Sequence, residues 1–388
     1  MNRLLKLSPV VMVLLYLTAA LIASIPPLFL PLKDFGTGAA MYTHYNNYVI
    51  FRNAYFHLLD GKDLYALWPT EQWDLFKYSP TFALCFSPFA QLPDGLGLPL
   101  WNVLNSGVLA IGIWRLQRIG VGRIGAFYLF VFIEMLTSIQ NAQSNALIAG
   151  LLLLALVDLE EDRSLTAALY IALTVFIKIF GLVFLLPVLF YNSRWRFALW
   201  FIIFSVLLLL LPLVVVPAER LLFLYRSWQA MLANDRAISE GLSVMGWLNS
   251  WFGWRPAKGL VTVTGAGLLL IPLVRYKLWG VRLFRLRYAA LVLIWMLIFN
   301  HRAESATFVI AVSGAGLYFF SKELLRYSDL LLMALLFVFT ILSPTDLFPA
   351  YLRAHFIIPY VMKAVPCIIL WVVIWVQLLT QQSEYDLP

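Results

Sequence analysis

Long uninterrupted apolar runs are the feature that most restricts the fold of this chain. Residues 9–32, 197–217 and 357–379 each reach the length of a bilayer-spanning helix, about 20 residues. Because the hydrocarbon core offers no partners for backbone groups, such runs must be helical; a barrel would show about ten-residue alternating strands instead. Only 12% of the residues are charged, against roughly 25% in soluble domains. The sequence predicts an all-α, polytopic membrane protein with one integral membrane domain, residues 1–388.

The basic residues predict how the chain crosses the membrane. The net charge is +8, but the cations lie mainly in short loops, which is typical of cytoplasmic turns and not of nucleic-acid binding. Placing these clusters inside allows one crossing between residues 80 and 114. We therefore expect residues 79–91 to form a short helix at the outer interface and the true span to begin near Pro93. The clusters are Arg115, Arg118 and Arg123; Arg194 and Arg196; Arg275, Lys277, Arg282, Arg285 and Arg287; and Lys322 and Arg326.

About twelve spans follow by alternation, with both termini cytoplasmic and the first apolar run retained as a helix. Spans four to six are short, so they are expected to leave a cavity open to the extracytoplasmic face. Two long outer segments, 33–92 and 218–258, would roof this cavity, and the first is expected to be helical. The expected spans are 9–32, 93–114, 124–140, 144–158, 164–178, 178–192, 197–217, 259–275, 288–301, 303–320, 330–343 and 356–379.

Lys178 is the sharpest single signal, because it interrupts an otherwise apolar stretch. An ammonium at membrane depth costs roughly 2.5–3.5 kcal/mol even on insertion scales. A lysine that snorkels to the interface is the plain alternative. At the outer tip of a helical hairpin, Lys178 would bind an anionic phosphate. Arg236, in the second outer segment, is a further candidate for phosphate binding.

An amide-rich turn lies between two apolar helices. Residues 140–145 read Gln-Asn-Ala-Gln-Ser-Asn, and amide groups both donate to and accept from sugar hydroxyls. Gln140, Asn141 and Gln143 are therefore candidates for sugar or acceptor binding. An ordinary polar turn remains an equal alternative.

A second polar turn, residues 300–304, lies at another outer helix end. It contains His301, Arg302 and Glu304. Histidine and arginine together can hold a phosphate diester, with arginine as a bidentate donor. In the structural alternative, Arg302 only pairs with Glu304.

The first outer loop has the composition of a site, because residues 44–80 combine aromatic rings, amides, carboxylates and cations. Transfer of a group to a hydroxyl needs a general base within hydrogen-bond reach. Together with Glu304, the candidates for this base are Asp63 and Asp74, although Asp63 can also shape a turn and Asp74 can simply neutralise Lys77. Lys77 is itself a candidate for sugar or acceptor binding, as are Tyr78 and Asn47.

Cofactor motifs are missing from the sequence. It contains no zinc-ligand spacing, no glycine-rich nucleotide loop and no serine–histidine–aspartate pattern, and its two cysteines lie far apart. We therefore expect no cofactor and no metal. A divalent metal is possible, but no pattern demands one.

Several of these motifs together resemble glycosyltransferase family 87. The resemblance covers roughly residues 40–320 and rests on weak motifs in a consistent order. The motifs are the pattern from Asn47 to Tyr65 (with Leu58-Leu59, Gly61 and Asp63-Leu64-Tyr65), Lys77-Tyr78-Ser79-Pro80, Leu92-Pro93, Trp101, Gln140-Asn141, and Lys178 at a helix junction.

The resemblance implies a membrane glycosyltransferase of the GT-C superfamily in a bacterial inner (plasma) membrane. Such enzymes move a sugar, often mannose, from a polyprenyl-phosphate donor to a lipid or glycan acceptor on the extracytoplasmic side. Basic residues hold the donor phosphate, for which Lys178, His301 and Arg302 are the matching candidates. Family members are generally inverting and use an aspartate base in the first outer loop.

This chain departs from the family pattern at Asn47, where an aspartate is expected. An amide cannot act as a general base at neutral pH. One interpretation is that Asp63, Asp74 or Glu304 supplies the base; another is a catalytically silent relative that binds a lipid-linked glycan. A transporter or flippase of a lipid-linked substrate is a third interpretation, although the sequence lacks the repeat symmetry typical of transporters.

Overall fold

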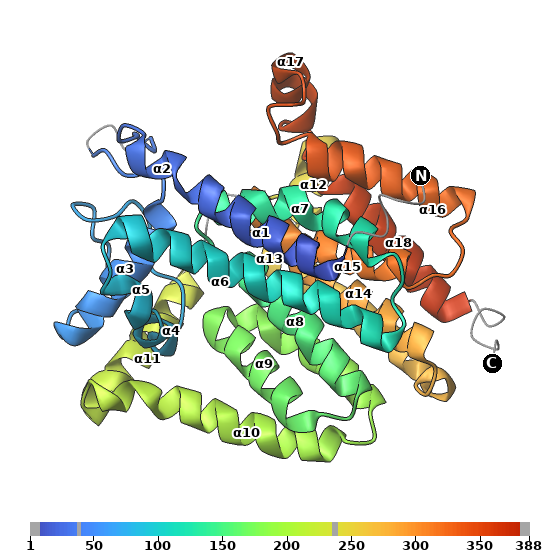
Figure 1. The fold of residues 1–388 in the computed structure, drawn as a ribbon, viewed down its shortest axis with the longest axis horizontal. Helices are drawn as coiled ribbons and strands as arrows, with labels where there is room; N and C mark the ends of the chain where they lie inside the picture. The colour runs from blue at the N-terminus through green and yellow to red at the C-terminus, as the bar shows by residue number, and fades with distance from the viewer. Residues whose placement is uncertain (1–7, 37–39, 235–239, 381–388) are drawn as a thin grey trace.

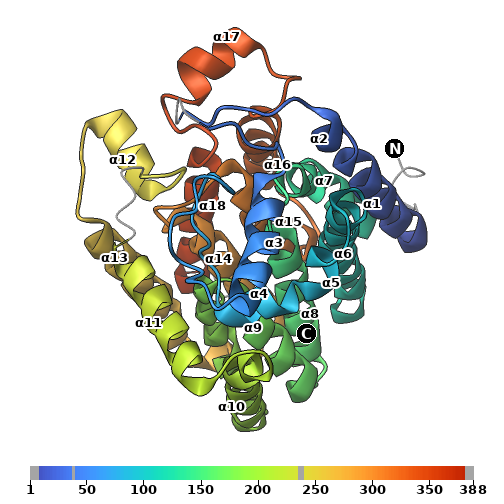
Figure 2. The same ribbon diagram turned by 90° about the vertical axis from the view of Figure 1, so that its left-hand side faces the viewer.

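The computed structural model describes residues 8–36, 40–234 and 240–380, and most of these residues are helical. Their one extended pairing is an isolated antiparallel bridge between Lys33 and Tyr42. Figure 1 shows the long helices lying side by side as one bundle, with α3, α4, α5 and α11 at its left-hand end and the end of α18 at its right. Figure 2 looks onto the left-hand end, where α3 and α4 cross in front of the bundle.

The α-helices are α1 (Pro9–Ser24), α2 (Pro26–Phe29), α3 (Asn46–Leu59), α4 (Pro80–Cys85), α5 (Ser87–Ala90), α6 (Asp94–Arg115), α7 (Ile124–Gln140), α8 (Asn145–Glu160), α9 (Ser164–Ile177), α10 (Arg194–Leu210), α11 (Ala218–Asn234), α12 (Val244–Phe252), α13 (Lys258–Leu270), α14 (Arg282–Ile298), α15 (Phe308–Phe320), α16 (Tyr327–Leu335), α17 (Ala350–Leu352) and α18 (Val365–Thr380). The 3₁₀ helices are η2 (Leu116–Ile119), η3 (Ile179–Phe190), η4 (Leu211–Val214), η5 (Ile271–Val274), η6 (Tyr276–Leu278) and η7 (Ser305–Thr307). Two π-helical stretches are η8 (Leu336–Leu342) and η9 (Arg353–Ile357).

Three helical segments among the described residues are long and apolar enough to cross a membrane. They are Pro9–Phe29, Asp94–Ile119 and Arg194–Val214. The other expected spans contain helices, but these are shorter; the run expected at 356–379, for example, becomes an α-helix only at Val365. A non-helical turn precedes Val365, with Val361 in the left-handed region at φ 51°. The all-helical class is therefore confirmed. Length and composition support three membrane spans, so the expected number of twelve is not confirmed.

The start of α6 agrees with the predicted short helix at residues 79–91 and a span that begins near Pro93. Residues 79–91 form two short helices, α4 and α5, and α6 begins at Asp94 directly after Pro93. Ser79 caps α4, because its hydroxyl accepts from the Phe82 N–H. The first outer segment is thus partly helical, with α3, α4 and α5 packed at the same end of the bundle.

Close packing of α6 on α8 depends on two glycines. A Cβ added at Gly150 would lie 2.5 Å from the Leu109 backbone nitrogen, and one at Gly112 would lie 2.8 Å from the Gly150 carbonyl oxygen. Small residues let helix backbones approach closely in membrane proteins. The contact orients α8, whose first residue, Asn145, belongs to the site described below.

We expect Gly150→Ala to destabilise the protein by about 1–3 kcal/mol, because the new methyl group must push the two backbones apart. Thermal unfolding in detergent measures the effect. Gly267→Ala is the matched control, because it lies inside α13 with no atom within 4 Å of the added Cβ. The control should be neutral or slightly stabilising. Equal melting temperatures for the two variants would contradict this account of the packing.

Candidate functional site

A cavity of about 610 Å³ lies where the first outer loop meets the ends of several helices. One part of its wall is polar, and another part is apolar. The polar lining consists of Asn47, Asp74, Lys77, Tyr78, Gln143, Lys178, Thr262, Asn300, His301, Arg302, Glu304 and Thr307. The apolar lining includes Ile50, Phe51, Leu75, Ile179, Phe180, Val183, Trp228, Leu232, Trp295, Met296 and Phe299. Most of the candidate residues singled out from the sequence are among the polar lining.

Three described candidates do not line the cavity. Gln140 and Asn141 are exposed and do not line the cavity, although the Asn141 carbonyl accepts from Asn47 Nδ2 at 2.9 Å. Both Asp63 carboxylate oxygens accept from the Ser227 hydroxyl at 2.9 Å, so Asp63 ties the first outer loop to α11. Arg236 lies outside the described residues.

Lys178 breaks the chain between α9 and η3. Its backbone is extended, with φ −139° and ψ 123°, so α9 ends there. A Cβ at Gly181 would lie 2.6 Å from Thr174 Oγ1, which shows how tightly the chain folds back after the break. The Lys178 ammonium lies 5.5 Å from the centre of the Tyr78 ring, which favours a cation there. The junction thus directs one cation into the cavity wall.

A chain of side-chain hydrogen bonds joins Lys178 to Glu304. Lys178 Nζ donates to Asn145 Oδ1 at 2.8 Å, and Asn145 Nδ2 donates to Gln143 Oε1 at 2.5 Å. Gln143 Nε2 then donates to Glu304 Oε2 at 2.8 Å. Asn145 is fully buried. It was not among the candidates taken from the sequence, although it closes the amide-rich turn at residues 140–145.

The two carboxylates of the cavity have different partners. Asp74 Oδ2 accepts from Lys77 Nζ at 2.6 Å, and Asp74 Oδ1 accepts from the Leu75 N–H at 2.7 Å. Glu304 accepts from the neutral amide of Gln143. Asp74 is therefore already paired with a cation, whereas the described bond to Glu304 comes from an uncharged donor.

The loop between α14 and α15 contributes the other two basic side chains. Burial lowers the pKa of Arg302, and the negative charges of Asp74 and Glu304 oppose this shift; the guanidinium stays protonated at neutral pH. Burial and the nearby charge of Lys258 lower the pKa of His301 below its ordinary value. His301 is therefore mainly neutral at pH 7 and acts as a hydrogen-bonding group, while Arg302 carries the positive charge.

No group of three or more histidine, cysteine, aspartate or glutamate side chains suited to a metal occurs within residues 8–36, 40–234 and 240–380. The chemistry available from the described side chains is phosphate binding by Lys178 and Arg302 and proton acceptance by a carboxylate.

The fold and the cavity define a helical membrane protein in which basic side chains and carboxylates line one cavity. The sequence model of glycosyltransferase family 87 matches residues 76–317, more than half of the chain, and the chain belongs to this family. It is accordingly a membrane glycosyltransferase. The match includes Lys178 and the 300–304 turn, but it begins after Asn47, Asp63 and Asp74. No curated protein matches the chain in sequence.

Proposed function

We propose that this protein transfers a hexose, mannose in the first instance, from a polyprenyl-phosphate donor to a lipid or glycan acceptor on the extracytoplasmic side of a bacterial plasma membrane. The observation that carries the proposal is one cavity in which Lys178 and Arg302 face the same space as Glu304 and an apolar wall. A lipid-linked sugar has matching parts: an anionic phosphate for the cations, hydroxyl groups for the polar side chains and a hydrocarbon chain for the apolar wall.

In the proposed mechanism, an acceptor hydroxyl oxygen attacks the anomeric carbon of the donor sugar. The new carbon–oxygen bond forms as the bond to the phosphate oxygen breaks, and polyprenyl phosphate leaves with the bonding electrons. A carboxylate takes the hydroxyl proton. Lys178 and Arg302 stabilise the negative charge that develops on the leaving phosphate.

The other polar lining residues would orient the sugar and the acceptor. Asn47 and Gln143 present amides to the cavity, and His301 presents a neutral imidazole. The rings of Tyr78 and Trp228 offer faces on which a sugar can lie. The apolar residues Ile179, Phe180 and Val183 follow Lys178 directly and suit the first isoprene units of a donor whose phosphate meets that lysine.

The placement of charges supports an outward-facing cavity. Asn145, at the start of α8, belongs to the site, whereas Glu160, at the end of α8, pairs with Arg285 at 2.6 Å. A 16-residue helix is about 24 Å long. Arg285 therefore lies about one helix length from the cavity, and by the positive-inside rule this supports a cavity that faces outward. The proposal keeps twelve crossings and two cytoplasmic termini.

We expect the purified protein to move label from a radiolabelled polyprenyl-phosphate sugar into new products when it is incubated with a membrane lipid extract. A soluble nucleotide sugar is the control donor, because its base and ribose do not fit an apolar wall. Tight binding of the lipid-linked donor without transfer, over several sugars and acceptors, would contradict the proposed activity. Transfer from the nucleotide sugar alone would contradict the proposed donor class.

A further inference from the structure

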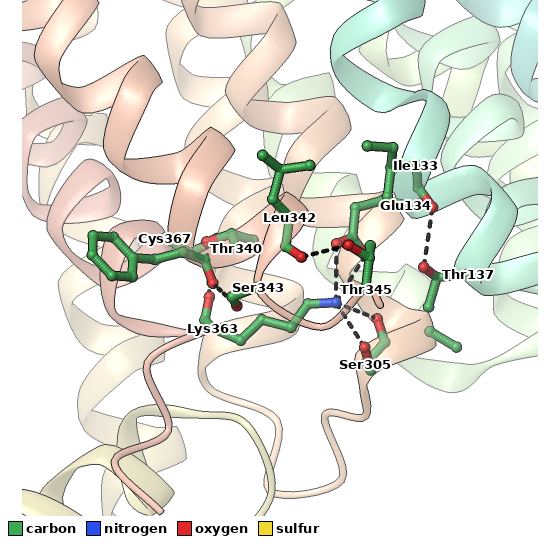
Figure 3. A network of polar contacts seen from close by, with 12 residues as sticks. Ile133, Glu134, Thr137, Ser305, Thr340, Leu342, Ser343, Thr345, Lys363 and Cys367 are labelled. Carbon is green, nitrogen blue, oxygen red and sulfur yellow. Dashed lines mark hydrogen bonds and ion pairs between the residues drawn. The ribbon is translucent and has the colours of Figure 1, made fainter. Parts of the chain in front are cut away.

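A buried ion pair outside the cavity lining has no part in the mechanism above (Figure 3). Lys363 is 3% exposed and lies in the turn before α18, and Glu134 of α7 is fully buried. Lys363 Nζ lies 2.9 Å from Glu134 Oε1 and 3.1 Å from Oε2. Two opposite charges far apart in the sequence therefore neutralise each other inside the bundle.

The pair reaches the cavity through Ser305. Lys363 Nζ donates to the Ser305 hydroxyl at 2.7 Å and to the Ser305 carbonyl oxygen at 3.2 Å. An ammonium has three N–H donors, so Glu134 and the two Ser305 oxygens occupy all of them. Ser305 directly follows Glu304, whose side chain lines the cavity. Figure 3 shows the Lys363 side chain extended between Glu134 and Ser305.

Lys363 is itself fixed in place. The Thr340 hydroxyl of η8 donates to the Lys363 carbonyl oxygen at 2.8 Å. The ammonium also lies 4.6 Å from the centre of the Phe308 ring, at the start of α15. Through these contacts the lysine links η8 and α7 to Ser305, the residue next to Glu304.

Other hydrogen bonds hold the residues on either side of Glu304 and Ser305. The Ala303 carbonyl accepts from the Leu242 N–H at 2.8 Å, and the Ala306 carbonyl accepts from Asn145 Nδ2 at 3.1 Å. These bonds secure the two flanks of the segment. Lys363 secures Ser305 between them.

We propose that Lys363 is a positioning residue for Glu304: neutralised by Glu134, it clamps Ser305 and so fixes the direction in which the preceding carboxylate enters the cavity. This inference rests on the proposed function, in which a cavity carboxylate accepts the acceptor proton. A buried ion pair is weak evidence for stability, because apolar residues of similar size serve a fold equally well. Its contacts with Ser305 supply the positional role.

The test is the double variant Lys363→Met with Glu134→Leu. It removes both charges together, so no unpaired charge remains buried, and the bundle can keep its fold. The matched control is Lys322→Met with Asp329→Asn, another buried pair (2.7 Å), located after the opposite end of α15. Each protein is examined for sugar transfer and for backbone hydrogen exchange of the peptide that covers residues 300–307.

We expect the Lys363/Glu134 variant to lower kcat by roughly 100-fold, the loss expected when a catalytic group moves by about 1 Å, with KM for the donor nearly unchanged. Exchange should speed up at the Ala303 and Thr307 amides, which bond to Asn300 and Glu304 carbonyls. The control pair should change neither quantity.

In a transferring enzyme, faster exchange together with the fall in kcat supports the positioning role, and any other combination overturns it. If the unaltered protein transfers no sugar, the proposed function fails, and exchange alone then decides whether Lys363 holds the segment. Normal exchange in the folded double variant overturns the inference in either case. The two failures are therefore distinguishable.

Discussion

Replacing Lys178 by methionine should abolish measurable sugar transfer while leaving the protein folded. Lys178 is one of the two cavity side chains, with Arg302, that are proposed to stabilise the leaving phosphate. Removal of one preorganised donor to a developing negative charge typically lowers kcat by roughly 10²–10³-fold. Methionine has a similar length and is apolar, so the expected loss comes from the missing charge.

The fold should tolerate Lys178→Met, because the main structural loss is one partner of Asn145 Oδ1. An unpaired buried acceptor costs about 1–3 kcal/mol. Thermal unfolding in detergent checks this cost beside the transfer assay. Lys62→Met is the matched control: Lys62 pairs with Asp60 at 3.1 Å in the first outer loop and does not line the cavity. Full transfer activity in the Lys178 variant would remove this residue from the site.

The parts of the site that were predictable from the sequence are those where a polar residue interrupts an apolar run. Lys178 was identified in this way, because a cation inside a hydrophobic stretch is costly unless it has a partner. The same criterion applies to Glu134 and Lys363, which also lie in apolar runs. Lys363 was instead absorbed into the span expected at 356–379, and so a signal that was present in the sequence was missed.

Contacts between distant parts of the chain could not be predicted. The bond from Ser227 to Asp63 spans 164 positions, and the one from Gln143 to Glu304 spans 161. No local pattern shows that Asp63 bonds to α11 or that the chain of side-chain hydrogen bonds from Lys178 ends at Glu304. The type of helix was also not predicted: the span expected at 178–192 forms a 3₁₀ helix over Ile179–Phe190.

The departure at Asn47 acquires a physical interpretation in the structure. Its Nδ2 donates to the Asn141 carbonyl at 2.9 Å, so the amide links α3 to the amide-rich turn. An aspartate cannot donate this bond. The side chain is therefore suited to orienting the turn, and the proton acceptor must be sought among the carboxylates that line the cavity, Asp74 and Glu304.

Glu304→Gln should lower kcat more than Asp74→Asn does. Glu304 lines the cavity, and its described hydrogen bond comes from the uncharged amide of Gln143. Asp74 instead accepts from the Lys77 ammonium at 2.6 Å, so one of its oxygens is already engaged by a cation rather than open to an acceptor hydroxyl. Loss of a general base costs roughly 10²–10⁴-fold. Glutamine keeps an oxygen that can accept from Gln143, so donor affinity and folding should be preserved.

Glu71→Gln is the matched control for this comparison, because Glu71 lies in the first outer loop, pairs with His57 at 2.8 Å and does not line the cavity. Single-turnover transfer and donor binding, measured on the same preparations, separate loss of the base from loss of substrate. A low rate in Asp74→Asn beside a normal rate in Glu304→Gln would move the base to the first outer loop, where the family pattern expects it. Normal rates in both variants would exclude these two carboxylates, because neither amide can accept the proton at neutral pH.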